Sequence, residues 1–542
     1  MRLDPAPRGN SPAVSWSAGH EATLLVLLVA GGAMLVLASR THVPSQLLLV
    51  VGGLALALIP GAPTVEMPPE VVFVAFLPPL LYVGAYYTSL RDLRANVRQI
   101  GLLSIGLVLT TTIVVAVIAH AAIHGLAWSS GFILGAIVSP TDAIAVTAMG
   151  QRFGLPRRLV VVLEGESMFN DATALVAYRL AVAAAVAGSF SLVDAGLHFV
   201  LISAGGLIVG LAVAYPVRLL RRSLDDPPIE VTLSLATGYI AFLPAELLHV
   251  SGVLAVVSAG VYLGWHAPEL TSPTGRLLGS STWETVTLAL NTAVFALVGL
   301  QLRPVLDALG SYTTLELVRD GALVSATVIL IRFLWVFPST YLPRLHRGVR
   351  ERDANPHPRD PAFVAWAGLR GAVSLAAALA LPLTDRAGAP LANRPLIVFL
   401  TYCVILTTLV GQGLTTPLVI RLLRLEEDGT VEDEEARSRI SAADAALERL
   451  DELVRDGSLR EETADRLRGV YRSRRSRMQA RVDKGDDGAI EERSVAFQHV
   501  RRELLEAERD AIVTLRNEGH ISDEAMHNVE RELDLEDERL DV

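Results

Sequence analysis

Long runs of apolar residues alternate with short polar segments from about residue 21 to about residue 425. A bilayer core of about 30 Å is crossed by about 20 apolar helical residues, so runs of this length predict membrane-spanning helices. They lie near residues 21–38, 45–60, 70–87, 100–120, 129–150, 159–186, 192–217, 230–248, 252–266, 280–302, 318–342, 362–382 and 395–423. The pattern therefore predicts an all-α polytopic membrane protein with about thirteen spans.

The pattern changes at the end of the thirteenth run. From about residue 436 the chain is rich in Glu and Arg, and apolar residues recur at helical spacing, as at Leu447, Leu450 and Leu453. Gly and Asp residues at 457–458, 483–488 and 519–523 predict turns between these helices. We expect residues 426–542 to form a helical cytoplasmic tail. It is either a plain solvated appendage or an element that regulates transport or reinforces a dimer.

Positive residues gather in alternate loops, which predicts how the chain is oriented. Cytoplasmic loops carry an excess of Arg and Lys. The loops that lie inside when the N-terminus is outside contain Arg40, Arg91, Arg94, Arg98, Arg152, Arg157, Arg158, Arg218, Arg221, Arg222, Arg344, Arg347, Arg350, Arg352 and Arg359. We therefore expect residues 1–20 to be extracytoplasmic and the tail to be cytoplasmic. The first run could instead be a cleaved signal peptide, but acidic residues dilute its positive N-terminal region.

Composition excludes several classes of partner and site. Residues 426–542 hold 34 acidic and 20 basic side chains, and the rest of the chain holds 23 and 27, so the net charge of -10 belongs to the tail. We expect no nucleic-acid partner for so acidic a segment. The single cysteine, Cys403, excludes an intramolecular disulfide and a thiolate metal cluster. Lys484 is the only lysine, so positive charge within the spans must come from arginine.

The fifth run is interrupted by the polar segment Ser139-Pro140-Thr141-Asp142. Pro140 cannot donate a backbone hydrogen bond and clashes with the carbonyl one turn back, so the helix should open there. Irregular backbone within a membrane is tolerated where it lines a cavity or lies inside the protein. An opened helix beside the carboxylate of Asp142 is the outline of a site for a hard cation.

The sixth run carries the segment LEGESMFNDATALVAYR, with several polar side chains inside one apolar stretch. Glu164, Ser167 and Asp171 share one helical stripe, and Glu166 and Asn170 form the neighbouring stripe. Carboxylate, hydroxyl and amide oxygens suit small hard cations such as Na+ and Li+. We assign no role to Glu164 or to Arg179, which also lies in this run.

Two arginines stand inside later runs, Arg332 in ILIRFLWVFP and Arg370 in AWAGLRGAVSL. Gly368 and Gly371 allow a second local opening of the helix around Arg370. A charge at the bilayer centre costs about 2.5–3.5 kcal/mol on insertion scales, so such residues are retained where they have a function or a partner. Both arginines are candidates to compensate the buried acids. A plainer interpretation, that acid and base only fix helix packing, applies to them and to Glu166.

The motifs SPTDA, EGESMFND and GLRGAVSLA, in this order, closely resemble those of the monovalent cation:proton antiporter-1 family, the sodium/proton exchangers of bacteria and animals. The resemblance covers roughly residues 20–425. It implies two inverted repeats of six helices, with unwound fifth and twelfth spans that cross near the midplane. It also implies a dimerising scaffold (about 21–90 and 192–303) and a moving core (about 100–190 and 318–425) in a bacterial inner membrane. A homodimer is implied as well.

The same resemblance suggests roles for individual residues. Asp171 matches the aspartate that carries the cation or protons, with Na+ held by Asp171, Asp142, Thr141 and Ser167, and Asn170 matches the asparagine beside it. Glu166 and Arg332 match an intramembrane salt bridge, and Arg370 supports the crossover. An Asn-Asp pair is associated with electroneutral exchange. One departure is Val83, which stands where some prokaryotic members place a Glu.

These observations predict a secondary active antiporter that exchanges Na+, or Li+, for H+, with these ions as substrates and no cofactor. A K+/H+ antiporter on the same scaffold is the nearest alternative, and a cation channel gated by the tail is a more distant one. Transport assays with each cation separate the first two, and flux without counter-movement of protons would indicate the channel. No nucleotide-binding loop or catalytic triad motif occurs in the sequence, so we do not expect an enzyme.

Overall fold

The computed structural model describes residues 31–38, 40, 45–57, 69–142, 154–187, 192–300, 302–307, 309, 312–347, 357–384, 391, 393–425, 430–483 and 489–538. These residues are helical, with no β-strand among them, which confirms the all-α prediction. The chain divides into two compact units, Met1–Glu426 and Glu427–Val542.

The first unit holds the apolar helices. They are α2 Ser45–Ala57, α3 Pro69–Tyr87, α4 Leu90–Gly101, α5 Val108–Ala122, α6 Trp128–Val138, α8 Arg157–Ala187, α9 Leu192–Arg222, α10 Pro227–Leu247, α11 Gly252–Leu270, α12 Pro273–Leu300, α13 Leu302–Asp307, α14 Thr314–Tyr341, α16 Arg359–Trp366, α17 Ala372–Leu379, α18 Arg394–Ile405 and α19 Gly413–Leu423. Two π-helical segments join α4 to α5 and α18 to α19, namely η1 Leu102–Leu107 and η3 Leu406–Gln412.

Seven helical stretches in the described part of the chain are long and apolar enough to cross a membrane. They are Leu90–Ala122, Arg157–Val186, Val193–Arg222, Pro227–Leu247, Pro273–Leu300, Thr314–Leu345 and Arg394–Leu423. Shorter apolar helices occur at Ser45–Ala57, Val74–Tyr87 and Trp128–Val138. The first predicted span lies mostly outside the described residues, and the count of thirteen stays a prediction.

Local signals explain where several helices begin. At α14, Thr313 and Glu316 form a capping box in which each side chain bonds the other residue's backbone N–H. At α4, the hydroxyl of Ser89 accepts the N–H of Asp92. The expected loop between the third and fourth spans is therefore wrong in part, because Arg91, Arg94 and Arg98 lie on α4. This helix continues through η1 into the fourth span and buries Leu93 and Ile100.

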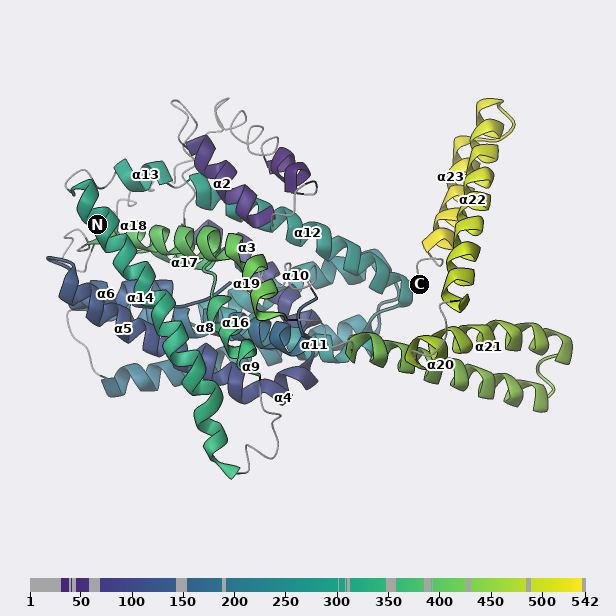
Figure 1. Cartoon of the computed structure of the whole chain (residues 1–542), viewed down its shortest axis with the longest axis horizontal. Helices are drawn as coiled ribbons and strands as arrows, with labels where there is room; N and C mark the ends of the chain where they lie inside the picture. Colours follow the sequence, from purple (N-terminus) through teal and green to yellow (C-terminus); the bar gives the residue numbers. More distant parts are fainter. Residues whose placement is uncertain are drawn as a thin grey trace, which may run out of the picture. The chain divides into compact units, whose positions relative to one another are not determined.

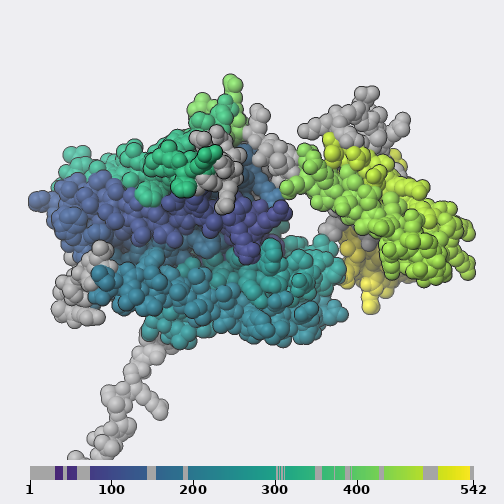
Figure 2. Space-filling model, turned by 90° about the horizontal axis from the view of Figure 1, so that it is seen from below, coloured from purple at the N-terminus to yellow at the C-terminus, as the bar shows by residue number. Residues whose placement is uncertain are grey.

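Helix α8 lies in the interior of the first unit, between two groups of helices (Figure 1). On one side α3, α9, α10, α11 and α12 enclose an apolar cluster around Tyr82 and Trp283. On the other side α5, α6, α14, α17 and α18 enclose a second cluster. Helices α2 and α3 pack against α12 and α11, so early and later segments of the chain lie side by side. Figure 2 views the molecule from below and shows blue-purple early residues next to teal and green-teal later ones.

The second unit consists of two helical hairpins. Helix α20 Thr430–Arg455 pairs with α21 Glu461–Asp483, and α22 Ala489–Asn517 pairs with α23 Asp523–Glu538. Gly457 and Gly519 adopt positive φ at the turns, which glycine does at no steric cost. Exposed ion pairs cross each hairpin, as between Arg475 and Asp444 and between Arg509 and Asp534. Such exposed pairs add little stability each, typically below about 1 kcal/mol.

Candidate functional site

Two breaks in membrane helices meet at the centre of the site. Helix α6 ends at Val138, and Ser139–Asp142 leave the helical path at Pro140, as expected for a residue without a backbone donor. Residues 367–371 form the second break, between α16 and α17. The N–H of Asp142 donates to the carbonyl of Leu369 at 2.8 Å, so the two breaks touch through the backbone. The continuation of the fifth span beyond Asp142 lies outside the described residues.

Glycines on either side of Arg370 permit this close approach. A Cβ at Gly368 would collide with the side chain of Arg332, and a Cβ at Gly371 would collide with the carboxylate of Asp142. Arg370 itself is fully buried, and its guanidinium donates to the carbonyl of Ser139 at the end of α6. The helix opening predicted from the GLRG segment is thus used to bring side chains from two other helices against the backbone.

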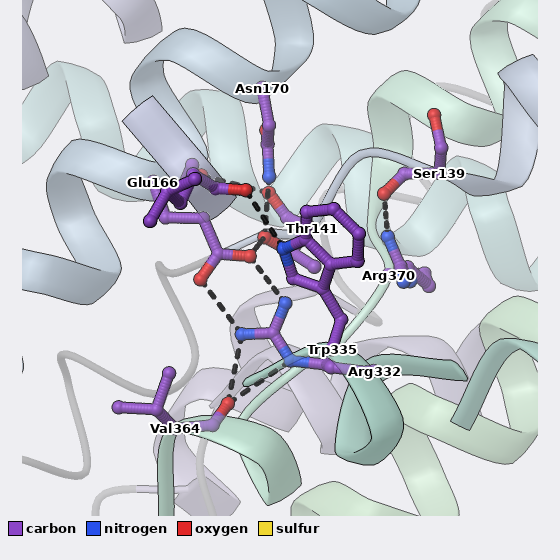
Figure 3. Close-up of polar contacts among 10 residues, drawn as sticks. Ser139, Thr141, Glu166, Asn170, Arg332, Trp335, Val364 and Arg370 are labelled. Carbon is purple, nitrogen blue, oxygen red and sulfur yellow. Dashed lines mark hydrogen bonds and ion pairs between the residues drawn. The ribbon is translucent and has the colours of Figure 1, made fainter. Parts of the chain in front are cut away.

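Glu166 on α8 and Arg332 on α14 form a buried ion pair (Figure 3). Both guanidinium Nη groups donate to the carboxylate, Nη2 to Oε2 at 2.8 Å, and each residue is 1% exposed. Arg332 also donates from Nε and Nη2 to the carbonyl of Val364, at 3.1 and 2.9 Å. That carbonyl belongs to the last turn of α16, where helices leave acceptors unpaired. The pair therefore holds the end of a broken helix as well as neutralising two charges.

A chain of hydrogen bonds leads from this pair toward the opened backbone of the fifth span. Thr141 donates its hydroxyl to Oε1 of Glu166 at 3.1 Å and accepts Nδ2 of Asn170 at 2.6 Å (Figure 3). With Nδ2 fixed in this way, Oδ1 of Asn170 is buried and has no hydrogen-bond partner among the described residues. Because a buried acceptor without a partner is rare, this oxygen is a candidate ligand.

Asp171 follows Asn170 on α8 and is 7% exposed. The charged groups whose fields act on its carboxylate are Asp142, which repels it, and Arg370, which attracts it. Ser167, one turn earlier, donates its hydroxyl to the carbonyl of Thr141 at 2.9 Å. Ser167 and Asn170 of α8 thus hydrogen-bond Thr141 in the break that follows α6, and Asp171 on the same helix interacts electrostatically with Asp142 in that break.

The candidate ligand atoms in this region are oxygens of carboxylate, amide, hydroxyl and backbone groups. Hard cations prefer such oxygens, whereas zinc and other transition metals favour imidazole and thiolate. Within the described part of the chain no three His, Cys, Asp or Glu residues come together as a metal site would require. Oxygens of this kind are suited to a hard cation, and a carboxylate among them can also take up a proton.

Sequence reasoning missed two contacts of this region. Arg179, at the far end of α8, donates to both oxygens of Glu246 on α10 at 2.6 and 2.7 Å. Trp335, one turn from Arg332, donates to the carbonyl of Leu102 at 3.0 Å, where the π-helical segment η1 begins. Both contacts join residues far apart in the sequence. The only sequence signal for the pair of Arg179 and Glu246 is that two opposite charges stand within apolar runs.

Comparisons with known proteins agree with the geometry. The profile of the family described as "Sodium/hydrogen exchanger, transmembrane" matches residues 24–422. The chain is 36% identical over 526 residues to an uncharacterized Na+/H+ exchanger of Mycobacterium tuberculosis, covering 93% of each protein. It is 32% identical over 408 residues to the sodium, potassium, lithium and rubidium/H+ antiporter of Bacillus pumilus, covering 73% of this chain and 61% of that one.

A solved structure shares the fold. The sodium proton antiporter MjNhaP1 from Methanocaldococcus jannaschii superposes with a TM-score of 0.59 at 19% identity, covering 75% of this chain and 98% of that chain.

Proposed function

The chain belongs to the sodium/hydrogen exchanger family, and on this premise we propose that it exchanges Na+ or Li+ for H+ across a membrane by secondary active antiport. The family is one of membrane transporters with bacterial members, so cations, protons and the lipid bilayer are its partners. The proton gradient drives the cycle, and we expect neither a cofactor nor an enzymatic reaction.

The observation that carries this proposal is the position of Asp171. Its carboxylate is buried on a continuous helix that hydrogen-bonds the first break through Ser167 and Asn170, and it interacts electrostatically with Asp142 and Arg370 of the two breaks. A buried carboxylate needs compensation, because leaving an ion uncompensated in a dry site is expensive. Either a cation or protons supply it, and the two compete for the same group. Exchange follows if the site changes sides only when it is occupied.

The surrounding residues have separate tasks in this scheme. Asp171, Asp142, Thr141 and Ser167 supply oxygens to the cation, and the unpartnered Oδ1 of Asn170 is a further ligand. The Glu166–Arg332 pair does not bind the cation.

The ion pair instead orients the hydroxyl of Thr141, and through Thr141 the amide of Asn170. The positive charge of Arg370 lowers the free-energy cost of ionising Asp171. Its guanidinium also joins the two breaks by its hydrogen bond to the carbonyl of Ser139. One neutral amide and one titrating aspartate favour one proton per cation.

The cycle also requires relative motion within the first unit. We propose that the helices around residues 100–190 and 318–425 move as a core against a scaffold at about 21–90 and 192–303, and that the scaffold forms a homodimer. The positive residues of alternate loops support an N-terminus outside and a C-terminus in the cytoplasm. The location that fits is a bacterial plasma membrane.

The ion class is tested by dye dequenching in inverted membrane vesicles. Respiration acidifies the lumen, and Na+, Li+ and K+ are then added in turn while a pH dye reports proton efflux. We expect dequenching with Na+ and Li+, and none in vesicles that carry Asp171→Asn. Dequenching by none of the three cations in wild-type vesicles that contain the folded protein would contradict the proposal.

A K+/H+ antiporter is the second candidate, because the Bacillus pumilus relative is described as transporting potassium and rubidium as well as sodium and lithium. In the same assay, dequenching by K+ at concentrations comparable to Na+ would favour this candidate.

A further inference from the structure

The exposure of α8 falls along the stripe that contains Asp171. Val160, Glu164 and Ser167 are partly exposed, whereas Asp171 is 7% exposed. The next two positions of the stripe, Ala174 and Tyr178, are again buried. The stripe is therefore partly exposed on the N-terminal side of Asp171, which we call its open part, and buried on the C-terminal side, which we call its closed part. A carboxylate and a hydroxyl on the partly exposed part of the stripe would be costly against lipid, so any role of this part in ion passage requires that water reaches Glu164 and Ser167.

Glu164 contrasts with Glu166, the other glutamate of this stretch. It makes no hydrogen bond or ion pair with any residue that the structure describes, although Glu166, two positions later, makes three such contacts. It does not cap a helix, because α8 begins seven residues earlier at Arg157. An acid that is partly buried inside a membrane span, with no compensating partner among the described residues, is a candidate to be compensated by a mobile counter-charge.

We propose that Glu164 is a cation-approach residue: a carboxylate that binds the incoming Na+ transiently and passes it along the stripe, past Ser167, to Asp171. The inference rests on the antiport proposed above. Seven residues of helix separate the two carboxylates, about 10 Å along the axis. A unit charge at that distance, in the range of effective dielectric constants between a protein site and water, changes local cation affinity roughly three- to tenfold.

The first experiment compares Glu164→Gln with wild type in the vesicle assay. We expect the KM for Na+ to rise roughly three- to tenfold when Na+ is added on the side from which α8 begins, with less than a twofold change in kcat. Glu164→Asp should restore most of the affinity. Glu284→Gln is the matched control, because Glu284 is an exposed acid of α12 that lies outside the stripe, and this change should leave KM unaltered.

Three outcomes of this experiment would overturn the proposal. An unchanged KM in Glu164→Gln means that the carboxylate plays no part in cation approach. A loss of kcat at constant KM means that Glu164 acts in the transport step. An equal rise in KM from both sides of the membrane means that it acts on Asp171 directly. Wild-type vesicles without exchange would instead count against antiport itself.

A second experiment needs no transport. In a Cys403→Ser background, which has no other cysteine, Glu164→Cys should react with a membrane-impermeant thiol reagent from one side only. Added Na+ should slow the reaction at this position. Ala174→Cys, on the closed part of the same stripe, should not react from that side. Failure of Glu164→Cys to react in folded protein would show that water does not reach the stripe, and would refute the approach path.

Discussion

The buried pair of Glu166 and Arg332 should show strong non-additivity when its members are removed. Each residue is 1% exposed, and the carboxylate accepts from both Nη groups of the guanidinium. In Glu166→Gln the charged Arg332 keeps only the carbonyl of Val364 as a strong acceptor. In Arg332→Met the charged Glu166 keeps only the hydroxyl of Thr141. Either change leaves one ion buried without an opposite charge.

The size of the effect follows from this burial. Breaking a buried pair by removing one partner costs about 3–5 kcal/mol, whereas replacing both partners with uncharged residues is often nearly neutral. We therefore expect each single variant to lose about 3–5 kcal/mol of stability and the double variant to lose less than either. The pair of Arg179 on α8 and Glu246 on α10 is the control. Its side chains are 39% and 31% exposed, so its coupling should stay below about 1 kcal/mol.

Thermal unfolding of the purified protein in detergent measures both double-mutant cycles. The unfolding temperature should fall in Glu166→Gln and in Arg332→Met and should recover in the double variant. Single losses that simply add up in the double variant would refute the pairing. Equal coupling in the Arg179 and Glu246 cycle would refute the argument from burial.

Three further outcomes are expected. Asp171→Asn should abolish exchange at every pH and remove the thermal stabilisation by Na+, because a ligand stabilises only a fold that binds it. The variant should be at least as heat-stable as the wild type, because a desolvated charge is lost. Exchange retained in this variant would move the carrier to Asp142 or Glu164. Exchange in proteoliposomes should not respond to a potential clamped with valinomycin, and a clear change in rate would exclude one-for-one stoichiometry. Truncation after about residue 436 should leave exchange active with an altered pH dependence, since the tail belongs to a separate compact unit. Complete loss of exchange in a folded truncation would make the tail part of the transport machinery.

The sequence predicts the features of the site that arise from backbone chemistry. Pro140 removes a donor, so the break in the fifth span could be expected from one residue. The apolar runs predicted most membrane helices within a few residues, and the three motifs indicated the family that the profile match confirms. The search for apolar runs does not find α4, because this helix is mostly polar, although Ser89 and the spacing of Leu93 and Ile100 are signals of an amphipathic helix.

Contacts between distant segments could not be derived in this way. Arg370 was expected to compensate buried acids, and its guanidinium is bonded to the backbone carbonyl of Ser139. The position of that carbonyl depends on how two broken helices cross. Arg179 and Glu246 stand 67 residues apart in the sequence, and the residues around either one do not indicate that the other is its partner. Helical periodicity places residues on a face but does not say which face of another helix it meets.

The backbone bond from the N–H of Asp142 to the carbonyl of Leu369 has a consequence for how this site evolves. Both atoms are present in every amino acid except proline, which lacks the donor. Substitutions at position 142 that keep the size of the side chain, which lies against Gly371, can therefore change the charge beside the carrier aspartate while the backbone bond between the two breaks is kept. Ion preference can then diverge among descendants of this chain without loss of the contact that joins the two breaks.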